Sequence, residues 1–342
     1  MLNSLVLGIE SSCDETAVAV VKDGWKVLAN EVASQINLHS RYGGVVPEVA
    51  SRQHLESLPF LVTEVLKQSQ VSYDDLTGIA VTAAPGLIGA LLVGLSAAKG
   101  LAFRLHLPLA TVHHIEAHLY ATQLDSSPVD FPALGLVVSG GHTELYHMEG
   151  WGQYRLLAST RDDAAGEAFD KVAKLMGLGY PGGPLIEKLA KLSPESKEKF
   201  TIAKMKDKSQ DFSFSGLKTA VALQLKKSPL KNEKDKEQLA AKFQNTVLEE
   251  IVLRVRRALG ELKPKSLVVG GGVACNLALR DVLKKEVDAA GAALRVPPPK
   301  YCSDNAAMVA GLGAYQLSHG RHAAFSATAT ASPSSASPFL LQ

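Results

Sequence analysis

The sequence predicts an α/β protein made of two related halves, because two kinds of local pattern each occur twice along the chain. The first pattern is a β-hairpin. Residues 4–9 and 17–21 read as apolar strands joined by a short polar turn. Residues 133–138 and 144–148 repeat the figure around a turn of small residues. Two such hairpins, far apart in the chain, indicate an internal duplication.

The two hairpins superpose residue by residue. Sliding one copy onto the other places Gly8 on Gly135 and Thr16 on Thr143, with strands matching on both sides. So large an offset favours two related halves over a short-period solenoid. Hairpins with small-residue turns are common. The hairpins alone therefore favour neither duplication nor coincidence.

The second repeated pattern is a strand, a glycine-containing turn and a helix. It occurs at 78–103 and at 265–287, with the turns at 83–86 and 270–276. Glycine lets backbone N–H groups approach a phosphate, and the start of the following helix favours its negative charge. A tight connection with no ligand is the plain alternative. Together with the hairpins, the two turns favour a nucleotide cleft between two α/β halves.

The bulk composition is that of an ordinary enzyme. The chain has 342 residues, 46% of them hydrophobic, and a net charge of +2. A chain of that length is longer than one hydrophobic core typically supports. The near-neutral net charge predicts no overall electrostatic attraction to nucleic acid. Cys13, Cys275 and Cys302 are odd in number and far apart, which favours a reducing compartment over a disulfide framework.

We expect a cytoplasmic location without a membrane span. The chain runs directly into the apolar residues 5–9, which are too few for the core of a secretion signal. The longest apolar stretch, 87–103, falls short of spanning length because it is interrupted. The interrupting residues are Gly89, Gly94, Lys99 and Gly100.

The predicted organisation has two halves and a tail. The N-terminal half covers 1–130, and residues after about 306 are expected to pack back on it. The C-terminal half covers 131–318 and contains a lysine-rich helical insertion at 188–242. Residues 319–342 are rich in Ser, Ala, Thr and Pro, so we expect a disordered tail that is dispensable for activity.

The lysine-rich insertion has two interpretations. It carries fourteen lysines against seven acidic residues, and no arginine. Such runs are most often solvated helix faces. The alternative is a surface that contacts the phosphates of a nucleic acid.

A metal site is suggested by His114 and His118, because four residues on a helix bring both rings onto one face. The plain alternative is a pair of structural histidines. A metal would need a third ligand, and a site of two histidines and one carboxylate suits zinc or ferrous iron. The candidates for that third ligand are Asp14, Glu15, His142, Asp170 and Asp304.

The spacing argues against a metalloprotease of the H-E-x-x-H type. In that motif the glutamate directly follows the first histidine and serves as general base. Here Glu116 comes two residues after His114, about 200° around a helix, so it points away from the imidazoles.

Two further helices are predicted, each with candidate caps. Residues 162–176 are helical in pattern, with Asp162 or Asp163 as N-cap, and Asp170 lies four residues before Lys174 as in a surface ion pair. Residues 306–317 form a small-residue helix. Capping is the ordinary role for the residues just before it, Asp304 and Asn305.

The chain resembles the tRNA threonylcarbamoyladenosine transferases, the TsaD family, formerly described as O-sialoglycoprotein endopeptidases. The resemblance extends over about residues 5–317 and rests on ten motifs in order, which are far more specific than any one of them. They are GIESSCDET at 8–16, ASRQH at 50–54, PGLIG at 85–89, HHIEAH at 113–118, VSGGHT at 138–143, AFDK at 168–171, YPGGP at 180–184, FSFSGLK at 212–218, GGGVACN at 270–276 and SDN at 303–305.

The resemblance implies both a fold and a reaction. The fold would be that of actin, sugar kinases and Hsp70, in which two duplicated ribonuclease-H-like halves surround a nucleotide cleft. The reaction would transfer a threonylcarbamoyl group from threonylcarbamoyl-AMP to N6 of adenine 37, in tRNAs that read codons beginning with A.

The resemblance also implies site residues. The metal ligands would be His114, His118 and Asp304, holding one divalent ion, with iron(II) favoured and zinc as the alternative. We further hypothesise that Asp14 positions the attacking amino group or accepts its proton. Val138, Ser139, Gly140, Gly141 and His142 would hold the acyl adenylate, and Asp170, Gly183 and Asn276 its adenosine part.

The implied partners are tRNA, threonylcarbamoyl-AMP and, in the bacterial setting, an inactive paralogue and a small ATPase. The competing functions are a metallopeptidase acting on glycoproteins, a small-molecule kinase of the same superfold and a non-catalytic paralogue. The position of Glu116 opposes the first of these. Paired histidines on a helix oppose the kinase, and the intact histidines with Asp304 oppose the non-catalytic paralogue.

Overall fold

The computed structural model describes residues 3–42, 44–196, 198–201 and 210–332, and it divides into two compact units. Unit 1 contains the residues up to Pro128 and those from Pro297 onward, and unit 2 is Val129–Val296. The sequence-based division assigned 297–305 to the C-terminal half. The structure places these residues in unit 1, so the chain returns to the first unit earlier than expected.

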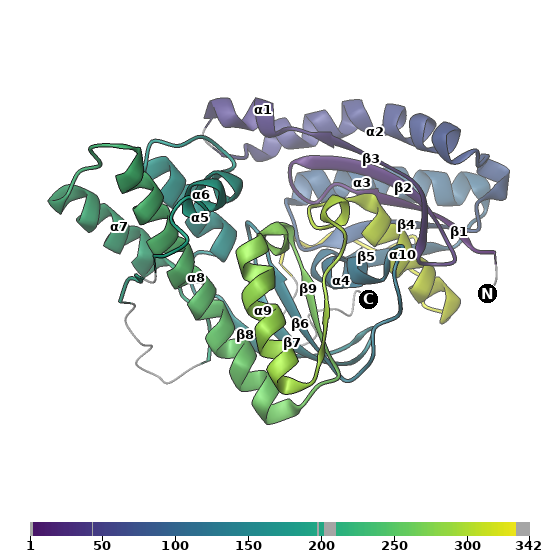
Figure 1. Cartoon of the computed structure of the whole chain (residues 1–342). Helices are drawn as coiled ribbons and strands as arrows, with labels where there is room; N and C mark the ends of the chain where they lie inside the picture. The colour runs from purple at the N-terminus through teal and green to yellow at the C-terminus, as the bar shows by residue number, and fades with distance from the viewer. Residues whose placement is uncertain (1–2, 43, 197, 202–209, 333–342) are drawn as a thin grey trace. The chain divides into compact units, whose positions relative to one another are not determined.

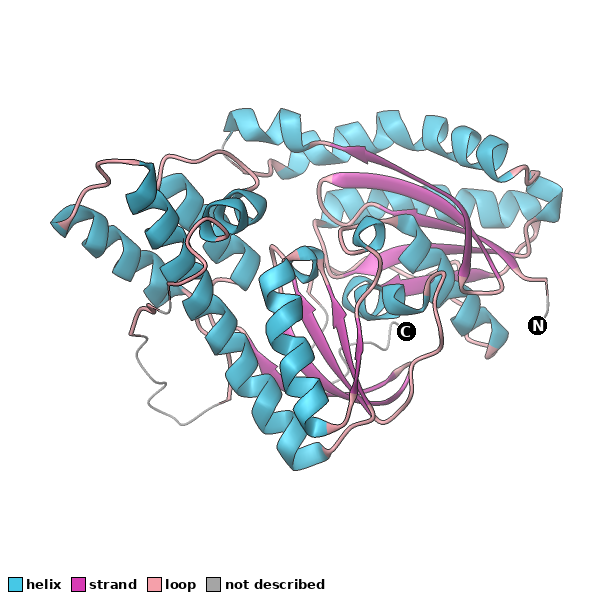
Figure 2. Ribbon diagram, in the orientation of Figure 1, coloured by secondary structure: helices cyan, strands magenta, loops and turns pink. Residues whose placement is uncertain are grey.

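Unit 1 is built on a five-stranded mixed sheet with the strand order β3-β2-β1-β4-β5 (Figure 2). Strands β1, β2 and β3 are antiparallel neighbours, whereas β4 and β5 run parallel to β1. The strands are β1 (Leu5–Glu10), β2 (Glu15–Lys22), β3 (Lys26–Ser34), β4 (Gly78–Ala84) and β5 (Leu109–His113). The carboxyl ends of the parallel strands β1, β4 and β5 therefore meet at one edge of this sheet.

Helices cover both faces of this sheet. On one face α2 and α3 pack over a core that includes Leu7, Ile9 and Val81, and on the other α10 lies along the central strands with α4 beside it (Figure 1). The helices are α1 (Ile36–His39), α2 (Pro47–Ser69), α3 (Ile88–Leu105), α4 (His114–Tyr120) and α10 (Ala306–Ser318). Short 3₁₀ turns lie at Ser40–Tyr42, Tyr73–Asp75, Ala121–Gln123 and Pro299–Tyr301.

The contact between α10 and the sheet depends on a glycine in the central strand. A Cβ atom on Gly8 would lie 2.5 Å from the Ala306 carbonyl oxygen and 2.6 Å from the Ala310 nitrogen. Both atoms belong to the backbone of α10 and cannot turn aside as the end of a side chain could. Alternation along β1 thus buries Leu7 and Ile9 under α2 and α3, while Gly8 lets α10 approach from the other face.

Unit 2 repeats the sheet of unit 1. Its order is β10-β9-β6-β7-β8, so β6 to β10 take the places of β1 to β5, with the same antiparallel and parallel pairs. Gly8 pairs with Ala19, and Gly135 pairs with Tyr146, as the superposition of Gly8 on Gly135 requires. The predicted duplication is therefore confirmed. The strands are β6 (Ala133–Val138), β7 (Thr143–Gly150), β8 (Gln153–Ser159), β9 (Ser266–Gly270) and β10 (Ala293–Arg295).

The helices of unit 2 include a long one that begins inside the predicted lysine-rich insertion of 188–242 and continues beyond it. This is α8 (Glu233–Leu262), which packs against α6 and α9. The others are α5 (Ala165–Leu175), α6 (Gly182–Ala190), α7 (Ser215–Lys227) and α9 (Leu277–Ala290), with a 3₁₀ turn at Gly272–Cys275. Residues 197 and 202–209 of the predicted insertion lie outside the described residues.

Asp162 does not cap α5, contrary to the prediction. Helix α5 begins after Ala164, and Asp162 instead accepts hydrogen bonds from the backbone N–H groups of Phe214 and Ser215 at the start of α7. The hydroxyls of Ser213 and Ser215 donate to the same carboxylate. Burial would raise the pKa of Asp162, but these donors hold it below the usual range. The FSFSG motif is thus a helix start anchored by a distant carboxylate.

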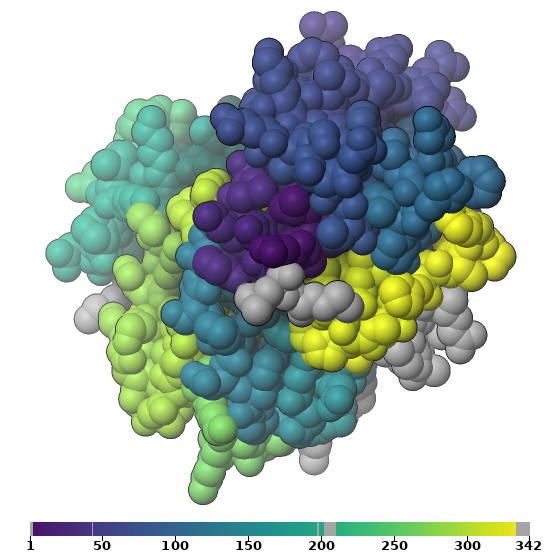
Figure 3. Space-filling view, turned by 90° about the vertical axis from the view of Figure 1, so that its right-hand side faces the viewer, coloured from purple at the N-terminus to yellow at the C-terminus, as the bar shows by residue number. Residues whose placement is uncertain are grey.

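The residues after α10 contradict the prediction of a disordered tail from 319. The Ala323 N–H donates to the Leu109 carbonyl, and the Thr330 N–H donates to the Ala83 carbonyl. Lys99 Nζ donates to the Ala327 carbonyl at 2.5 Å, and Ala327 is buried. Figure 3 shows these yellow residues on the surface beside the blue part of unit 1. Small side chains suit this segment because its backbone lies directly on the unit. Residues 333–342 of the predicted tail lie outside the described residues.

The segment 319–332 is therefore expected to contribute to stability. Truncation after Ser318 should lower the free energy of unfolding by roughly 1 to 3 kcal/mol, because it removes backbone hydrogen bonds and exposes apolar surface near Leu109. Denaturant titration measures the change, and truncation after Ser332 is the matched control. Equal stabilities for the two truncated proteins would refute this expectation.

One helix among the described residues, α3, is long and apolar enough to cross a membrane by length and composition alone. Its Leu95, Ala98 and Ala102 lie in the core beneath the sheet.

Candidate functional site

The histidine pair lies at the carboxyl edge of the sheet in unit 1. Strand β5 ends at His113, and α4 begins at His114, so His118 follows one turn later on the same helix. The two ring centroids are 4.5 Å apart. Asp304, just before α10, places its Oδ1 3.6 Å from His114 Nε2 and 3.1 Å from His118 Nε2. Two segments far apart in sequence thus converge on one point.

The donor set of this cluster fits a divalent metal ion. One ligand atom from each of His114, His118 and Asp304 lies within 4.8 Å of the others. Among the described residues neither ring nitrogen of His118 has a hydrogen-bond partner of good geometry, although the ring is almost fully buried. A buried imidazole without a partner is costly, and a cation between the rings and the carboxylate would satisfy it. Glu116 is not part of this cluster.

The cluster is surrounded by acidic groups. Burial would lower the pKa of His114, but the charges of Glu10 and Asp304 outweigh it and raise the pKa to about 9. Burial, followed by the charges of Asp304 and Asp14, raises the pKa of Glu15 to about 9. So many carboxylates around two imidazoles form a site that favours positive charge.

Asp14, the predicted catalytic residue, lies in the turn between β1 and β2 and is buried. Its carbonyl accepts a hydrogen bond from the Gln35 N–H, which ties the turn to the segment after β3. The turn is also held by His54 of α2, whose Nε2 contacts the Cys13 carbonyl at 3.0 Å and whose Nδ1 contacts Thr16 Oγ1 at 2.8 Å. Asp14 therefore sits on a fixed turn that belongs to the same unit as the histidines.

The residues predicted to hold the acyl adenylate form a closed turn after β6. The Ser139 N–H donates to the His142 carbonyl at 2.8 Å, and the His142 N–H donates to Ser139 Oγ at 3.1 Å, so Gly140 and Gly141 form the tip of the turn. Val138 is the last residue of β6. This turn stands where the Asp14 turn stands in unit 1.

The glycine-rich turn after β9 lies against the same strand end. Gly271 has a φ of +91°, and a Cβ atom there would collide with the Val138 carbonyl. Only glycine combines this conformation with so close an approach. The turns that follow the parallel neighbours β6 and β9 thus meet at the carboxyl edge of the sheet, where open α/β sheets bind ligands.

The predicted adenosine residues lie on helices around this edge. Asp170 of α5 accepts a hydrogen bond from the Gly182 N–H at 2.7 Å, which joins it to the start of α6, where Gly183 is the next residue. No ion pair between Asp170 and Lys174 is observed among the described residues. Lys171 instead binds Asp163 at 2.6 Å.

Asn276 caps α9, because its side chain accepts a hydrogen bond from the Leu279 N–H. Its Nδ2 donates to Gln244 of α8 at 2.9 Å. The next residue, Leu277, donates its N–H to Glu187 of α6. The helices that carry Asp170, Gly183 and Asn276 are therefore linked by hydrogen bonds within unit 2.

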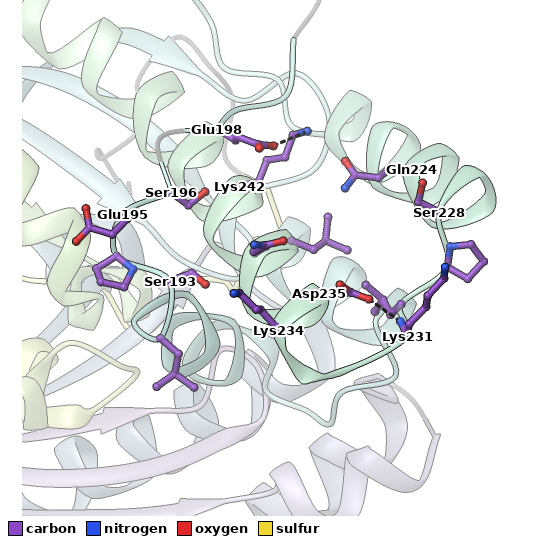
Figure 4. A pocket seen from close by; sticks show the side chains of 16 residues that line it. Ser193, Glu195, Ser196, Glu198, Gln224, Ser228, Lys231, Lys234, Asp235 and Lys242 are labelled. Carbon is purple, nitrogen blue, oxygen red and sulfur yellow. Dashed lines mark hydrogen bonds and ion pairs between the residues drawn. The ribbon is translucent and has the colours of Figure 1, made fainter.

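A groove of about 800 Å³ contains none of the predicted site residues. It lies in unit 2 between the segment after α6 and the start of α8, and its walls carry both signs of charge (Figure 4). Lys242 pairs with Glu198 across it, and Lys199 and Lys236 pair with Glu249 and Glu233 nearby. Such pairing favours solvated helix faces as the explanation of these lysines.

The comparisons with known proteins decide the family. The family model described as tRNA N6-adenosine threonylcarbamoyltransferase, TsaD, matches residues 26–311. The chain belongs to this family. A TsaD relative of the same description from Geobacter sp. (strain M21) is 54% identical over 316 residues, 92% of each chain. One from Clostridium perfringens (strain SM101) is 48% identical over 321 residues, covering 94% of this chain and 95% of its own.

Two solved structures support the fold of this TsaD family member. Component A of the (R)-2-hydroxyglutaryl-CoA dehydratase from Acidaminococcus fermentans has a TM-score of 0.56 at 16% identity, covering 93% of this chain and all of its own. Full-length HypF has a TM-score of 0.62 at 15% identity, covering 94% of this chain and 57% of its own. With the duplicated sheets, they establish the fold of actin, sugar kinases and Hsp70.

Membership in the TsaD family also settles the class of reaction. The chain is an enzyme that threonylcarbamoylates tRNA at N6 of adenosine. Nothing in the comparisons favours the peptidase or the kinase. The sequence reading of function is therefore confirmed at this level.

Proposed function

We propose that the enzyme transfers the threonylcarbamoyl group of threonylcarbamoyl-AMP to N6 of adenine 37, in tRNAs that read codons beginning with A, and that it requires one divalent metal ion. The observation that carries the metal requirement is the convergence of His114, His118 and Asp304, with the His118 ring nitrogens lacking other partners among the described residues. Iron(II) is favoured and zinc is the alternative, because both accept two imidazoles and a carboxylate.

The reaction depends mainly on making the carbonyl carbon of the donor more electrophilic. The adenine amino group reacts poorly because its lone pair is delocalised into the ring. A bound cation would supply Lewis-acid stabilisation of the carbonyl or of the departing phosphate, worth several kcal/mol by order of magnitude. AMP is a good leaving group, so no covalent intermediate on a side chain is needed.

The protein's own groups would bind and orient the two substrates. In this proposal residues 138–142 hold the acyl adenylate through the backbone N–H groups of Gly140 and Gly141 at the tip. The N–H groups of Ser139 and His142 bond within the turn and keep it preorganised. Asp170, Gly183 and Asn276 contact the adenosine part. Asp14 positions the attacking amino group or accepts its proton.

The experiment combines purified enzyme, threonylcarbamoyl-AMP and unmodified tRNA, followed by nucleoside analysis. Metal-depleted and reloaded enzyme are compared, with the inactive paralogue and small ATPase of the bacterial system added in parallel. Modified adenosine that depends on metal supports the proposal. Full activity after complete metal removal would refute the metal requirement, and no product under any condition would refute the choice of donor.

We also propose that the enzyme works in the cytoplasm together with the inactive paralogue and the small ATPase. The support is the enzyme's action on tRNA and its similarity to bacterial relatives over more than nine tenths of the chain. Affinity purification of the tagged protein from its own cells tests this. Recovery of neither partner from the soluble fraction would count against it.

Metal binding is expected to strengthen as the pH rises. Because the pKa of His114 is raised to about 9, its ring carries an extra proton at pH 7, and a cation bound at Nε2 must displace that proton. Affinity should therefore rise about tenfold per pH unit up to about pH 9 and then level off. Competition with a chelator of known affinity, using zinc between pH 6.5 and 9.5, measures it. An affinity independent of pH below 8.5 would contradict the expectation.

A further inference from the structure

The most completely buried charged group beside the His114–His118–Asp304 cluster is Glu10. It is the last residue of β1 and has no exposed surface. An isolated buried carboxylate is very costly, so a protein retains one only where donors surround it. The partners of Glu10 therefore indicate its use.

Two donors fix the carboxylate in place. The Ser12 N–H donates to Oε1 at 2.6 Å, and the Thr82 hydroxyl donates to Oε2 at 2.6 Å. Ser12 belongs to the turn after β1, and Thr82 lies on the neighbouring strand β4. Because its two oxygens are held from two different segments, the carboxylate cannot rotate or withdraw.

The third partner is a candidate metal ligand. His114 Nδ1 lies 3.1 Å from Glu10 Oε2, while Nε2 of the same ring faces Asp304. A carboxylate can only accept, so the Nδ1 atom must carry the proton. In the neutral ring the lone pair is then on Nε2, the atom that faces the cluster. Ser12 Oγ lies 3.3 Å from Nδ1, at the same edge of the ring.

The two histidines differ in what fixes the orientation of the ring. His114 has a carboxylate behind its ring, at Nδ1, whereas Nδ1 of His118 has no hydrogen-bond partner among the described residues, and its Nε2 faces only Asp304. The orientation of His118 thus depends on packing, and that of His114 on a charged acceptor. Metal-bound histidines commonly have such an acceptor, which fixes the tautomer and raises ligand basicity.

We propose that Glu10 is a positioning residue, which holds His114 in the Nδ1–H tautomer with Nε2 directed at a divalent cation. The inference rests on the proposed metal function and deepens it, since it assigns a determinant of metal affinity outside the ligand set. Glu10 does not touch substrate or cation in this proposal. It acts through His114 alone.

The experiment measures metal affinity directly, with cobalt(II) and zinc as probes in competition with a chelator. Glu10→Gln keeps the shape of the side chain but replaces a charged acceptor with a neutral one, and it should weaken binding of both ions by about 10- to 100-fold. Glu144→Gln is the matched control. Glu144 is a partly buried carboxylate of β7, in the other unit, that accepts a hydrogen bond from Tyr146, and its variant should bind both ions as the wild type does.

A second readout separates positioning from a general structural role. In the zinc-loaded wild type the ¹⁵N shifts of His114 should show a protonated Nδ1 and a metal-bound Nε2, and Glu10→Gln should disturb this pattern while the metal-free variant still unfolds cooperatively. Wild-type affinity and an unchanged His114 spectrum in Glu10→Gln would overturn the proposal.

The design also separates this proposal from the function it rests on. A wild-type protein that binds neither ion would overturn both proposals. A wild type that binds metal but transfers the threonylcarbamoyl group equally well without it would refute the metal requirement, and the affinity loss in Glu10→Gln would still support the role of Glu10.

Discussion

Replacing His114 with alanine is expected to abolish divalent-metal binding and to lower tRNA threonylcarbamoylation by about 100-fold or more, since Lewis-acid stabilisation of several kcal/mol is lost. The fold should survive, because α4 is held by apolar residues such as Ile115 and Leu119, which are fully buried. Metal analysis of the purified variant and nucleoside analysis of its product measure the two effects.

The control for this substitution is His322→Ala, which removes an exposed imidazole from unit 1. It should retain metal and activity. If the His114 variant lost activity but kept a full equivalent of metal, the ligand role of His114 would be wrong, and a direct role in substrate binding would replace it.

Replacing Gly8 with valine is expected to destabilise unit 1 by more than about 3 kcal/mol, at the upper end of what overpacking costs. The added side chain meets the α10 backbone at Ala306 and Ala310, so the helix must move away from the sheet. Because Asp304 directly precedes this helix, metal affinity should fall as well. Denaturant titration and metal competition measure the two losses.

The matched control is Gly100→Ala on α3. A Cβ atom at Gly100 meets no atom within 4 Å, so alanine should fit and raise helix stability by up to about 1 kcal/mol. Equal stabilities for the Gly8 and Gly100 variants would show that α10 does not need its close approach to β1.

Much of the fold could be predicted because its hydrophobic patterns are local. The hairpin around residues 8–16 and its copy around 135–143 have strand and turn signals within twenty residues, and the structure has both. The third strand of each sheet, β3 and β8, was missed. Its residues are only partly buried, so they lack the apolar run that marks β1 or β6.

The site could be predicted only in part. The spacing of His114 and His118 is local and therefore readable. The chemistry of a third ligand leaves Asp304 among five candidates, and only the SDN motif at 303–305 distinguishes it. Glu10 was missed because nothing near it in sequence indicates His114, 104 positions away. Its partners are set by the pairing of β1 with β4 and by the position of β5, which are tertiary facts.

The segment after α10 shows the limit of composition as a guide. Runs of Ala, Ser and Thr bury little surface, and so they resemble linkers. In this protein the small side chains are what allow the backbone around Ala327 and Thr330 to lie against α3 and the end of β4. Low side-chain volume is compatible with close packing when a preformed surface is available.

The return of α10 to unit 1 sets the order in which the enzyme can be completed during synthesis. The sheet that carries His114 and His118 emerges from the ribosome first, but the helix that covers its second face and the carboxylate of Asp304 are made only after the whole of unit 2. Until then the strand face around Gly8 and Ala80 lacks α10, and the histidines lack the carboxylate of Asp304. A nascent chain cut short anywhere in unit 2 would thus have neither the helix that covers this face nor the complete His114–His118–Asp304 cluster.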